Sequence, residues 1–144
     1  MAIFRSGIRS VMPGNVRMLS GPGCPVCVTS NADLDRAAAL AKMPNVLLAT
    51  YGDMLKVPGS KESLAEVKAQ GYPVHIVYST LDALRLAHEH PDKQVVFFAI
   101  GFETTAPAAA AAVLQPRAQG LSNFSICSVM KLTIPGARAL LDMG

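Results

Sequence analysis

Two cysteines separated by two residues, Cys24 and Cys27, are the side chains of this chain best suited to chemistry. One thiolate of such a pair can attack while the other resolves, and nearby helix-terminal N–H groups can lower a thiol pKa below its ordinary value of about 8.5. A thiol pair can also hold a metal, or it can be a buried structural element. The spacing alone leaves the redox, metal-binding and structural interpretations open.

The residues around the two thiols predict a stiff, close-fitting turn. Gly21 and Gly23 allow backbone angles that other residues avoid. Pro22 and Pro25 fix φ and each remove a backbone donor. A predicted strand precedes this turn and a predicted helix follows it, which is where α/β proteins place their chemistry. We therefore favour a functional role for the thiol pair.

A second candidate site is the segment Gly101-Phe-Glu-Thr-Thr105. Gly101 permits a tight turn, and Glu103 offers a carboxylate that could relay protons or bind a cation. Thr104 and Thr105 offer hydroxyls. In the simpler interpretation, one threonine caps the next helix and the helix dipole favours the glutamate. The residues alone favour that simpler interpretation, and the segment lacks the glycine and lysine spacing of a phosphate-binding loop.

Asp53, the histidines and Cys127 are further candidate ligands. Asp53 follows a predicted strand, where ligand-binding residues gather in parallel sheets, but it could equally be a turn aspartate bonded to its own backbone. The three histidines have no convincing ligand spacing with the cysteines, and the second pair that a tetrahedral zinc site needs is missing. Cys127 lies in an apolar run and is interpreted as a small core residue.

The composition excludes several classes of protein. The 144 residues are 51% apolar and 16% charged, which is enough for a sizeable core. The net charge of +3 is scattered, so a nucleic-acid role has little support. The longest apolar run is far short of a membrane span, and the first residues make a poor signal peptide. The odd number of cysteines, 3, favours a reducing cytoplasm.

Apolar periodicity predicts an alternating order of strands and helices. Expected strands lie at 16–19, 46–50, 74–78, 95–100 and 124–129. Expected helices lie at 1–10, 30–43, from Ser60 or Ser63 to Gly71, from Ser79 or Thr80 to Pro91, at 106–119 with Pro116 ending or kinking it, and at 135–143.

Repeated strand–helix units of this kind predict an α/β fold with a parallel β-sheet and flanking helices. The strand at 95–100 is the clearest, because six consecutive apolar residues are typical of a strand buried on both faces. A polar stretch near residue 91 suggests a boundary. We expect one nearly complete α/β domain at 1–91, carrying the cysteine turn, and the start of a second at 92–144.

Four stretches of the chain resemble the HypD family of [NiFe]-hydrogenase maturation factors. They are, in family order, Gly21-Pro-Gly-Cys-Pro-Val-Cys-Val-Thr29, Tyr51-Gly-Asp-Met-Leu-Lys-Val-Pro-Gly-Ser60, Ile76-Val-Tyr-Ser-Thr-Leu-Asp-Ala-Leu84 and Val95-Val-Phe-Phe-Ala-Ile-Gly-Phe-Glu-Thr-Thr105.

The resemblance implies a scaffold for metal-centre assembly rather than an ordinary turnover enzyme. Such a protein holds an iron atom with a small partner, HypC, while cyanide and carbonyl ligands are attached to make Fe(CN)2CO, and the cyanide comes through a second partner, HypE. In the family, an iron-holding cysteine in a Cys-Gly-Gly-His-Thr motif precedes the region that matches Met1. The family also has a C-terminal domain with a [4Fe–4S] cluster. Neither is within this chain.

On this resemblance, Cys24 and Cys27 match the thiol pair of the family, implicated in redox chemistry or in holding iron. The segment from Gly101 to Thr105 matches a motif that faces the same cleft from the second of two similar domains. The first strand of the first domain would be missing. The family commonly has a histidine after the position of Cys127, and Ser128-Val129-Met130-Lys131 supplies none, so the match weakens there.

Two other functions stay open beside the maturation scaffold. One is a small thiol–disulfide oxidoreductase that uses Cys24 and Cys27 directly, although thioredoxin-like folds do not have this all-parallel order. The other is a plain α/β domain with an inert cysteine turn. Because a partial domain exposes sheet edges and apolar surface, we also expect the chain to self-associate.

Overall fold

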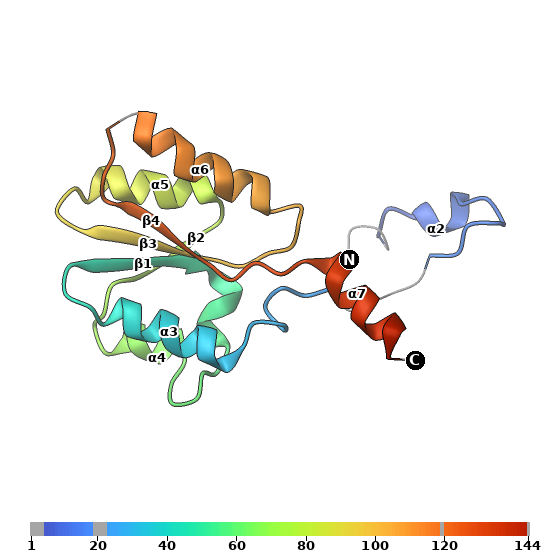
Figure 1. The fold of residues 1–144 in the computed structure, drawn as a ribbon, viewed down its shortest axis with the longest axis horizontal. Helices are drawn as coiled ribbons and strands as arrows, with labels where there is room; N and C mark the ends of the chain where they lie inside the picture. The colour runs from blue at the N-terminus through green and yellow to red at the C-terminus, as the bar shows by residue number, and fades with distance from the viewer. Residues whose placement is uncertain (1–4, 19–22, 119, 144) are drawn as a thin grey trace.

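A parallel four-stranded sheet forms the centre of the molecule (Figure 1). The computed structural model describes residues 5–18, 23–118 and 120–143. Within these residues the strands are β1 (Val46–Tyr51), β2 (Val74–Val77), β3 (Gln94–Ala99) and β4 (Phe124–Ser128). Their order across the sheet is β2-β1-β3-β4, and every neighbouring pair is parallel. The expected α/β fold with a parallel sheet is confirmed.

Alternate residues of the central strands face two separate cores. In β3, Val96 and Phe98 belong to one buried cluster, whereas Val95 and Phe97 belong to the other. Both phenylalanines are completely buried. This burial on both faces explains why β3 is a continuous apolar run rather than an alternating one.

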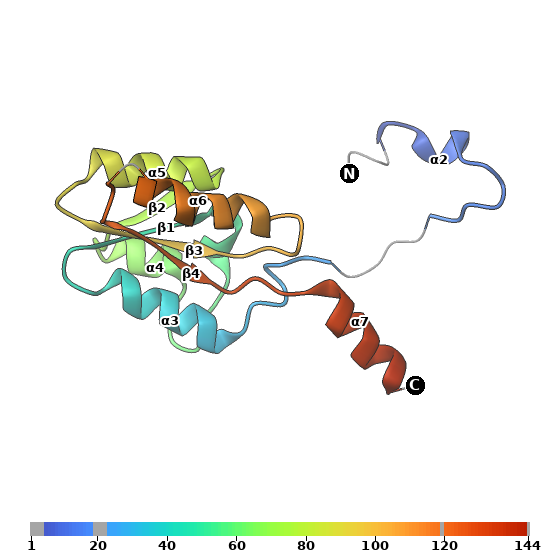
Figure 2. The ribbon, with the colours of Figure 1, turned by 45° about the horizontal axis from the view of Figure 1, so that its top comes forward.

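Helices cover both faces of the sheet, so the body of the molecule has three layers (Figures 1 and 2). On one face lie α3 (Asn31–Ala41) and α4 (Leu64–Ala69), and on the other lie α5 (Thr80–Glu89) and α6 (Ala106–Ala118). The buried stripe of α3 consists of the four residues that its helical spacing predicts: Leu34, Ala37, Ala38 and Ala41. The helices therefore hold the strand ends, and the turns that follow them, in fixed positions.

Serine caps decide where three of the helices begin. Ser30 accepts a hydrogen bond from the backbone N–H of Asp33 at the start of α3. Ser63 and Glu66 form a reciprocal capping box at the start of α4. Ser79 accepts from the N–H of Asp82 at the start of α5. In each case a side-chain oxygen satisfies a backbone donor that the first helical turn leaves without a partner.

The buried side chain of Asn123 fastens the end of α5 to the sheet. Its amide nitrogen lies 2.9 Å from the carbonyl oxygen of Ala87 and 3.0 Å from those of His90 and Lys93. The N–H of Val95, in β3, donates to the carbonyl of Asn123 at 2.8 Å. One residue before β4 therefore satisfies carbonyl groups that would otherwise be buried without donors.

The expected first strand, at 16–19, is wrong for the part that the structure describes. Residues 16–18 are irregular, and Val16 is 47% exposed, while residue 19 lies outside the described residues. The segment 5–18 extends away from the sheet, so it has no neighbouring strand with which to pair (Figure 2). A strand needs such a partner for its backbone groups. The described residues before the cysteine turn, 16–18, therefore form no strand.

Three expected helix boundaries also differ from the structure. Of the helix expected at 1–10, residues 1–4 lie outside the described residues, and the helix found there is the single turn α2 (Ile8–Val11). Helix α6 continues past Pro116 and ends two residues later, at Ala118. The last helix, α7 (Thr133–Asp142), begins two residues before Pro135. Pro135 thus occupies the first turn, where its missing N–H costs no helical hydrogen bond.

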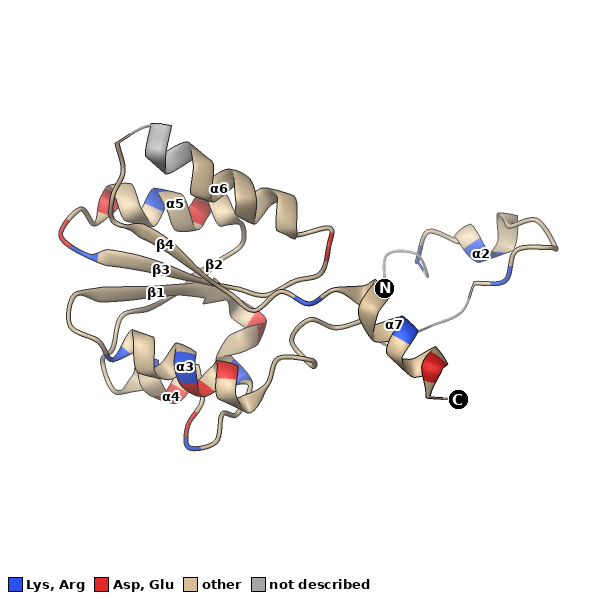
Figure 3. Cartoon of the chain, in the orientation of Figure 1, with Lys and Arg blue, Asp and Glu red and all other residues tan. Residues whose placement is uncertain are grey.

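Strands from both sides of the expected boundary near residue 91 lie in one sheet, because β3 pairs with β1. The division into two domains stays a prediction. In the described part of the chain, no helix is both long enough and apolar enough to cross a bilayer. Charged side chains are scattered over the helices and loops instead of gathering in one stripe (Figure 3).

Candidate functional site

A cavity of about 260 Å³ lies where three turns meet at the carboxyl end of the central strands. One turn carries the cysteines, one follows β1 as the 3-10 helix η1 (Gly52–Lys56), and one follows β3. The carboxyl end of parallel strands is the edge at which α/β proteins bind ligands. The lining residues are Cys24, Pro25, Val26, Tyr51, Asp53, Ile100, Gly101 and Thr105.

The cysteine turn is held by local hydrogen bonds and by one apolar anchor. The N–H of Cys27 donates to the carbonyl of Cys24 at 3.1 Å, and the Thr29 hydroxyl donates to the carbonyl of Pro25 at 2.9 Å. Val26 packs against the core cluster beneath it. Both thiols are exposed, and neither is in a disulfide. The turn therefore presents two accessible sulfurs on a fixed backbone.

The two thiols of the turn are electrostatically unequal. The Cys27 thiol donates a hydrogen bond to the Cys24 sulfur, which is the main reason that the pKa of Cys24 is lowered; the backbone N–H of Cys27 adds to the effect. The same hydrogen bond raises the pKa of Cys27. The charge of Asp53 partly opposes the lowering of the Cys24 pKa. Cys24 is therefore the sulfur that ionises first, and thiolate is the reactive form.

Gly101 allows the turn after β3 to pass close to the start of α6. A Cβ added at Gly101 would lie 2.6 Å from the Cβ of Thr105 and 2.7 Å from its Oγ1. No real pair of carbon atoms packs so closely. Gly101 therefore lets Thr105 reach the cavity, and the structure brings these two predicted residues together with Cys24 and Asp53.

Glu103 and Thr104, from the same turn, are not among the residues that line the cavity. The Glu103 carboxylate instead accepts from the backbone N–H of Thr133 at 2.6 Å and from its hydroxyl at 2.9 Å, at the start of α7. Its own backbone N–H, followed by these bonds from Thr133, lowers the pKa of Glu103. Thr104 is exposed. Glu103 therefore binds the start of α7, whereas the simpler interpretation of the sequence gave it only a favourable place in the dipole of α6.

The glycines of the cysteine turn have different positions. Gly21 lies outside the described residues. Gly23 lines a neighbouring apolar groove of about 670 Å³, which also involves Val28, Phe102, Met130 and the first turns of α7. The groove is therefore adjacent to the cavity along the chain, one residue from Cys24.

Reasoning from the sequence missed Tyr51 as a lining residue. It is the last residue of β1, and its ring packs edge-on against Phe97 with the ring centroids 5.5 Å apart. A signal was available, because Tyr51 comes just before Asp53 at the carboxyl end of an apolar strand. The sequence pattern assigns Tyr51 to the loop after the strand, so it is not among the residues predicted for the site.

The remaining candidate ligands lie elsewhere. Cys127 is half-buried in β4, and burial raises its pKa, as expected for a core thiol. His75 and His90 contact each other with ring centroids 6.0 Å apart, and burial is the main cause that lowers the pKa of His75. Among the described residues, no group of three histidine, cysteine, aspartate or glutamate side chains is placed to hold a metal ion.

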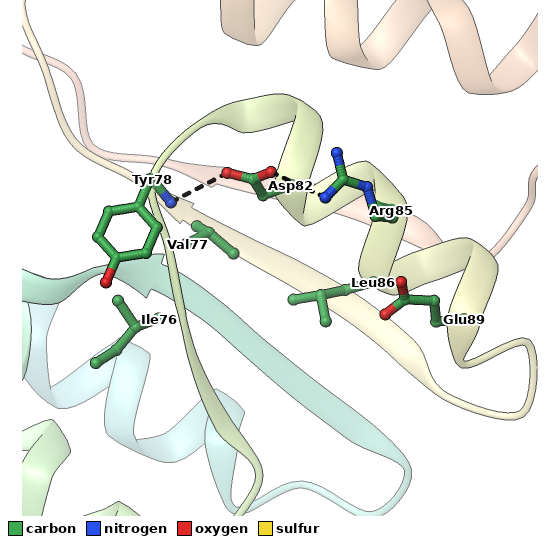
Figure 4. Close-up of a pocket in the computed structure, with 7 residues that line it drawn as sticks. All are labelled: Ile76, Val77, Tyr78, Asp82, Arg85, Leu86 and Glu89. Atoms are coloured by element: carbon green, nitrogen blue, oxygen red, sulfur yellow. Dashed lines mark hydrogen bonds and ion pairs between the residues drawn. The ribbon is translucent and has the colours of Figure 1, made fainter.

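A smaller hollow of about 170 Å³ lies between β2 and α5 (Figure 4). Two of its charged groups pair with each other: Asp82 accepts from the N–H of Tyr78 at 3.3 Å and lies 3.5 Å from Arg85. Figure 4 shows the Tyr78 ring over Ile76, at the outer edge of the sheet. The hollow contains none of the predicted site residues.

Comparison with known proteins identifies the same family as the motifs whose residues line the cavity. All of residues 1–144 match the family model HypD, described as the "Hydrogenase formation hypA family". The chain is 56% identical over 126 residues to a protein of Rhizobium leguminosarum bv. viciae named hydrogenase maturation factor HypD, covering 87% of this chain and 33% of that protein. It is 50% identical over 141 residues to the HypD of Azotobacter vinelandii, covering 97% and 37% of the two chains.

A similar match extends to a more distant relative. The HypD of Escherichia coli K12 is 44% identical over 141 residues, which is 98% of this chain and 38% of that protein. The chain thus spans about a third of the length of the curated relatives that it matches. Because the family model covers every residue, this chain belongs to the HypD family.

Proposed function

We propose that this chain forms the thiol-bearing part of a hydrogenase maturation scaffold. The observation that carries the proposal is the cavity itself, in which Cys24 meets Gly101 and Thr105. These residues come from two of the motifs that mark the family, and Cys24 is 77 positions before Gly101 in the sequence. The names of the matched relatives supply the process, hydrogenase maturation.

The cargo that we propose for this scaffold is the iron of the [NiFe] site, during its conversion to Fe(CN)2CO. Thiolates are soft ligands that suit iron, and Cys24 is the thiol whose hydrogen bonds favour the ionised form. Cys27 lies beside it and is exposed. In this role the two cysteines hold or reduce the cargo, and the residues around them leave space for its small ligands.

The same proposal includes partners, because the chain is about a third of a family protein. A small HypC-type chaperone would complete the iron coordination, and a HypE-type protein would deliver cyanide. Cys24 lines the cavity and both thiols are exposed, which supports access by another protein. Three free cysteines suit a reducing compartment, so we place this work in the cytoplasm.

Thiol–disulfide exchange is a second candidate function, favoured by the hydrogen bond between the two thiols and the opposite shifts of their pKa values. A low-pKa sulfur beside a protonated one is the arrangement of an attacking and a resolving thiol. Both candidate functions use Cys24 and Cys27, but the scaffold acts on bound iron and the oxidoreductase acts on a disulfide.

Segment exchange tests the maturation function. The 141 aligned residues of the Escherichia coli relative would be replaced by this sequence, and the chimaera expressed in a strain that lacks its own HypD. We expect hydrogenase activity to return. The double change Cys24→Ala and Cys27→Ala should abolish it, whereas Cys127→Ala, in β4, should not.

The result that overturns the maturation proposal is a folded chimaera, present at the normal level, that restores no hydrogenase activity. Activity that survives the loss of both cysteines would instead reject their role. Thiol–disulfide exchange alone is supported if the purified 144-residue chain reduces a model disulfide while the folded chimaera stays inactive.

A further inference from the structure

The stretch from Ile76 to Leu84 is one of the four that resemble the family, yet none of its residues lines the cavity. Burial and the cap of α5 account for six of its residues: Val77, Ser79, Thr80, Asp82, Ala83 and Leu84. The other three are exposed, Ile76 by 42%, Leu81 by 61% and Tyr78 by 89%. Core packing therefore does not explain these three large side chains.

β2, which carries Ile76, is an edge strand of the sheet. In the described part of the chain its one neighbouring strand is β1. The carbonyl of Pro73 accepts from the N–H of Leu48, in β1, and backbone groups along a strand alternate in direction. The N–H and carbonyl of Ile76 therefore point away from β1. An open edge of this kind is a template for pairing with another extended chain.

The two edges of the sheet differ in their exposed side chains. On β4, at the opposite edge, the exposed residues are Ser125 and Ser128. On β2 the exposed residue is Ile76, and Tyr78 follows just beyond the end of the strand. β2 also contains none of the lysine or proline residues with which proteins commonly protect an open edge. The β2 edge is therefore the one suited to apolar contact.

The hollow beside β2 has room for one side chain of an occupant. Its volume of about 170 Å³ is below the roughly 300–1,000 Å³ of pockets that hold small molecules. Figure 4 shows Leu86 and Glu89, from α5, across the hollow from Tyr78. Asp82 is paired with Arg85, whereas Glu89 has no hydrogen bond or ion pair among the described residues. The available charge of the hollow is therefore negative, which favours a cationic side chain in the occupant.

We infer that the β2 edge and this hollow form a docking surface for an extended segment of a partner protein. The segment adds to the sheet beside β2, and its backbone pairs with that of Ile76. One of its apolar side chains packs against Tyr78 and Leu81, and a lysine or arginine pairs with Glu89. Tyrosine is among the residues that most often dominate the binding energy of protein interfaces.

This docking surface adjoins the cavity of the cysteine turn. Val77 is in register with Tyr51, which lines the cavity. A Cβ added at the next residue, Gly52, would lie 3.4 Å from Cγ2 of Ile76. A partner held at β2 is therefore next to the residues proposed to hold the cargo. The inference rests on the proposed function for the existence of a partner protein, and it names the surface that this partner covers.

Site-specific photocrosslinking of the chimaera tests the inference. Benzoylphenylalanine replaces Tyr78, and the chimaera is expressed in the Escherichia coli strain that lacks its own HypD. Irradiation should link position 78 to one other protein, and mass spectrometry should place the link in an extended segment that contains lysine or arginine. The control position is Leu114, 68% exposed on α6, which packs against β4 at the opposite edge. It should give no such link.

Charge reversal and truncation then test the contacts with the protein identified by the link. Glu89→Lys should remove the link, and changing the basic residue of the segment to glutamate should restore it. Asp142→Lys, which reverses an exposed carboxylate of α7, is the matched control and should leave the link unchanged. Tyr78→Ala should weaken the purified complex at least about tenfold, the loss typical of a dominant interface tyrosine. Circular dichroism establishes that each variant keeps its helices.

Four results overturn the inference. They are the absence of any link from position 78, a link to a second copy of the chimaera, a link to another part of the same chain, and a link to a partner that Glu89→Lys leaves unchanged.

The outcome also separates this inference from the proposed function. A link that responds to charge reversal, in a chimaera that restores no hydrogenase activity, keeps the docking surface and rejects the maturation role. An active chimaera whose activity and partner binding survive both Tyr78→Ala and Glu89→Lys keeps the maturation role and rejects the docking surface.

Discussion

The Glu103 carboxylate accepts two hydrogen bonds from Thr133, at 2.6 Å from its backbone nitrogen and at 2.9 Å from its hydroxyl. A second contact lies beside this one, since the N–H of Lys131 donates to the carbonyl of Gly101 at 3.0 Å. The turn after β3 therefore contributes both to the cavity and to the anchoring of α7. Its Gly101 and Thr105 border the cavity, and its glutamate holds the first turn of α7.

Removing the Glu103 carboxylate should release α7 while leaving the sheet intact. In Glu103→Ala, the amide protons of α7 should exchange faster, because α7 has no buried residue of its own to hold it. Hydrogen exchange resolved by mass spectrometry measures this. Glu89→Ala, which removes an exposed carboxylate of α5, is the control and should leave α7 unchanged. Equal exchange in both variants would show that Glu103 does not anchor the helix.

The same anchor predicts a pH dependence of α7. The folded-state pKa of Glu103 is lowered by its own backbone N–H and by Thr133. Its stabilising effect is therefore complete above the ordinary glutamate pKa of about 4.3, and it is lost as the pH falls through the lower folded-state pKa. Exchange of the α7 amides, corrected for the intrinsic rate, should rise over that acidic interval in the unaltered chain and stay flat in Glu103→Ala.

Gly101→Ala should destabilise the fold through one contact. The new Cβ meets the Cβ of Thr105 at 2.6 Å, and overpacking of this kind typically costs about 1–3 kcal/mol. Urea denaturation measures the change. Adding Thr105→Gly should recover part of the loss, because it removes the opposing atoms, and Gly14→Ala serves as a control with nothing within 4 Å of its added carbon. Additive effects of the two changes would contradict a direct clash.

Asn123→Ala should lower the free energy of unfolding by about 2–3 kcal/mol. The change leaves the carbonyl groups of Ala87, His90 and Lys93 without their donor, and unpaired buried polar groups each cost about 1–3 kcal/mol before relaxation. Asn31→Ala, at an exposed position of α3, should change stability by much less. Thermal or urea unfolding compares the two variants, and similar losses would rule out the role given to Asn123.

The three thiols should differ in their rates of alkylation. Cys24 should react fastest near neutral pH, followed by Cys27, with Cys127 slowest because burial raises its pKa. Cys27→Ala removes the hydrogen bond to Cys24, raises the Cys24 pKa and should slow its reaction several-fold at neutral pH. Cys27→Ser keeps a donor and should slow it less. Mass spectrometry of iodoacetamide-treated protein gives each rate. If Cys27 reacts faster than Cys24 in the unaltered chain, the assignment of Cys24 as the thiol that ionises first is wrong.

The apolar face of α7 gives the expected self-association a location. Leu132 and Ile134 are 62% and 75% exposed, and Leu140 and Leu141 are 69% and 81% exposed. Replacing Leu140 and Leu141 by lysine should reduce the apparent mass in light scattering, because charge opposes apolar contact between copies. Leu81→Lys, on α5, is the control with a similarly exposed side chain. A monodisperse monomer for the unaltered chain would contradict the expectation.

The predictions from sequence succeeded where one local pattern sufficed. The apolar run that forms β3 has no polar residue to face solvent, so it predicted a strand that is buried on both faces. Burial on both faces in turn predicted a parallel sheet. For the helix that became α5, the sequence predicted an N-cap at either Ser79 or Thr80. The structure chose Ser79, because the buried Thr80 is already within the helix.

The prediction of a strand at 16–19 failed because its short apolar run lacks a partner. Strand propensity is local, but the hydrogen bonds of a strand come from another segment, and residues 16–18 have none beside them. The same limitation applies to Glu103. Its position in the sequence suggested only a favourable interaction with the dipole of the following helix, whereas in the fold its carboxylate accepts hydrogen bonds from Thr133, 30 residues later.

The amino-acid sequence by itself determined the alternation of strands and helices, the stiff cysteine turn and the family, since each depends on residue type and spacing along the chain. Only the tertiary structure decided which of these residues share a cavity. Asp53 and Thr105 meet there because parallel pairing of β1 with β3 brings the turns that follow these strands to the same edge of the sheet. Cys24 joins them from the segment before α3, whose Val26 packs against the core cluster. The same packing directs Glu103 away from that cavity, because the segment after β4 runs beside its turn and supplies the donors of Thr133.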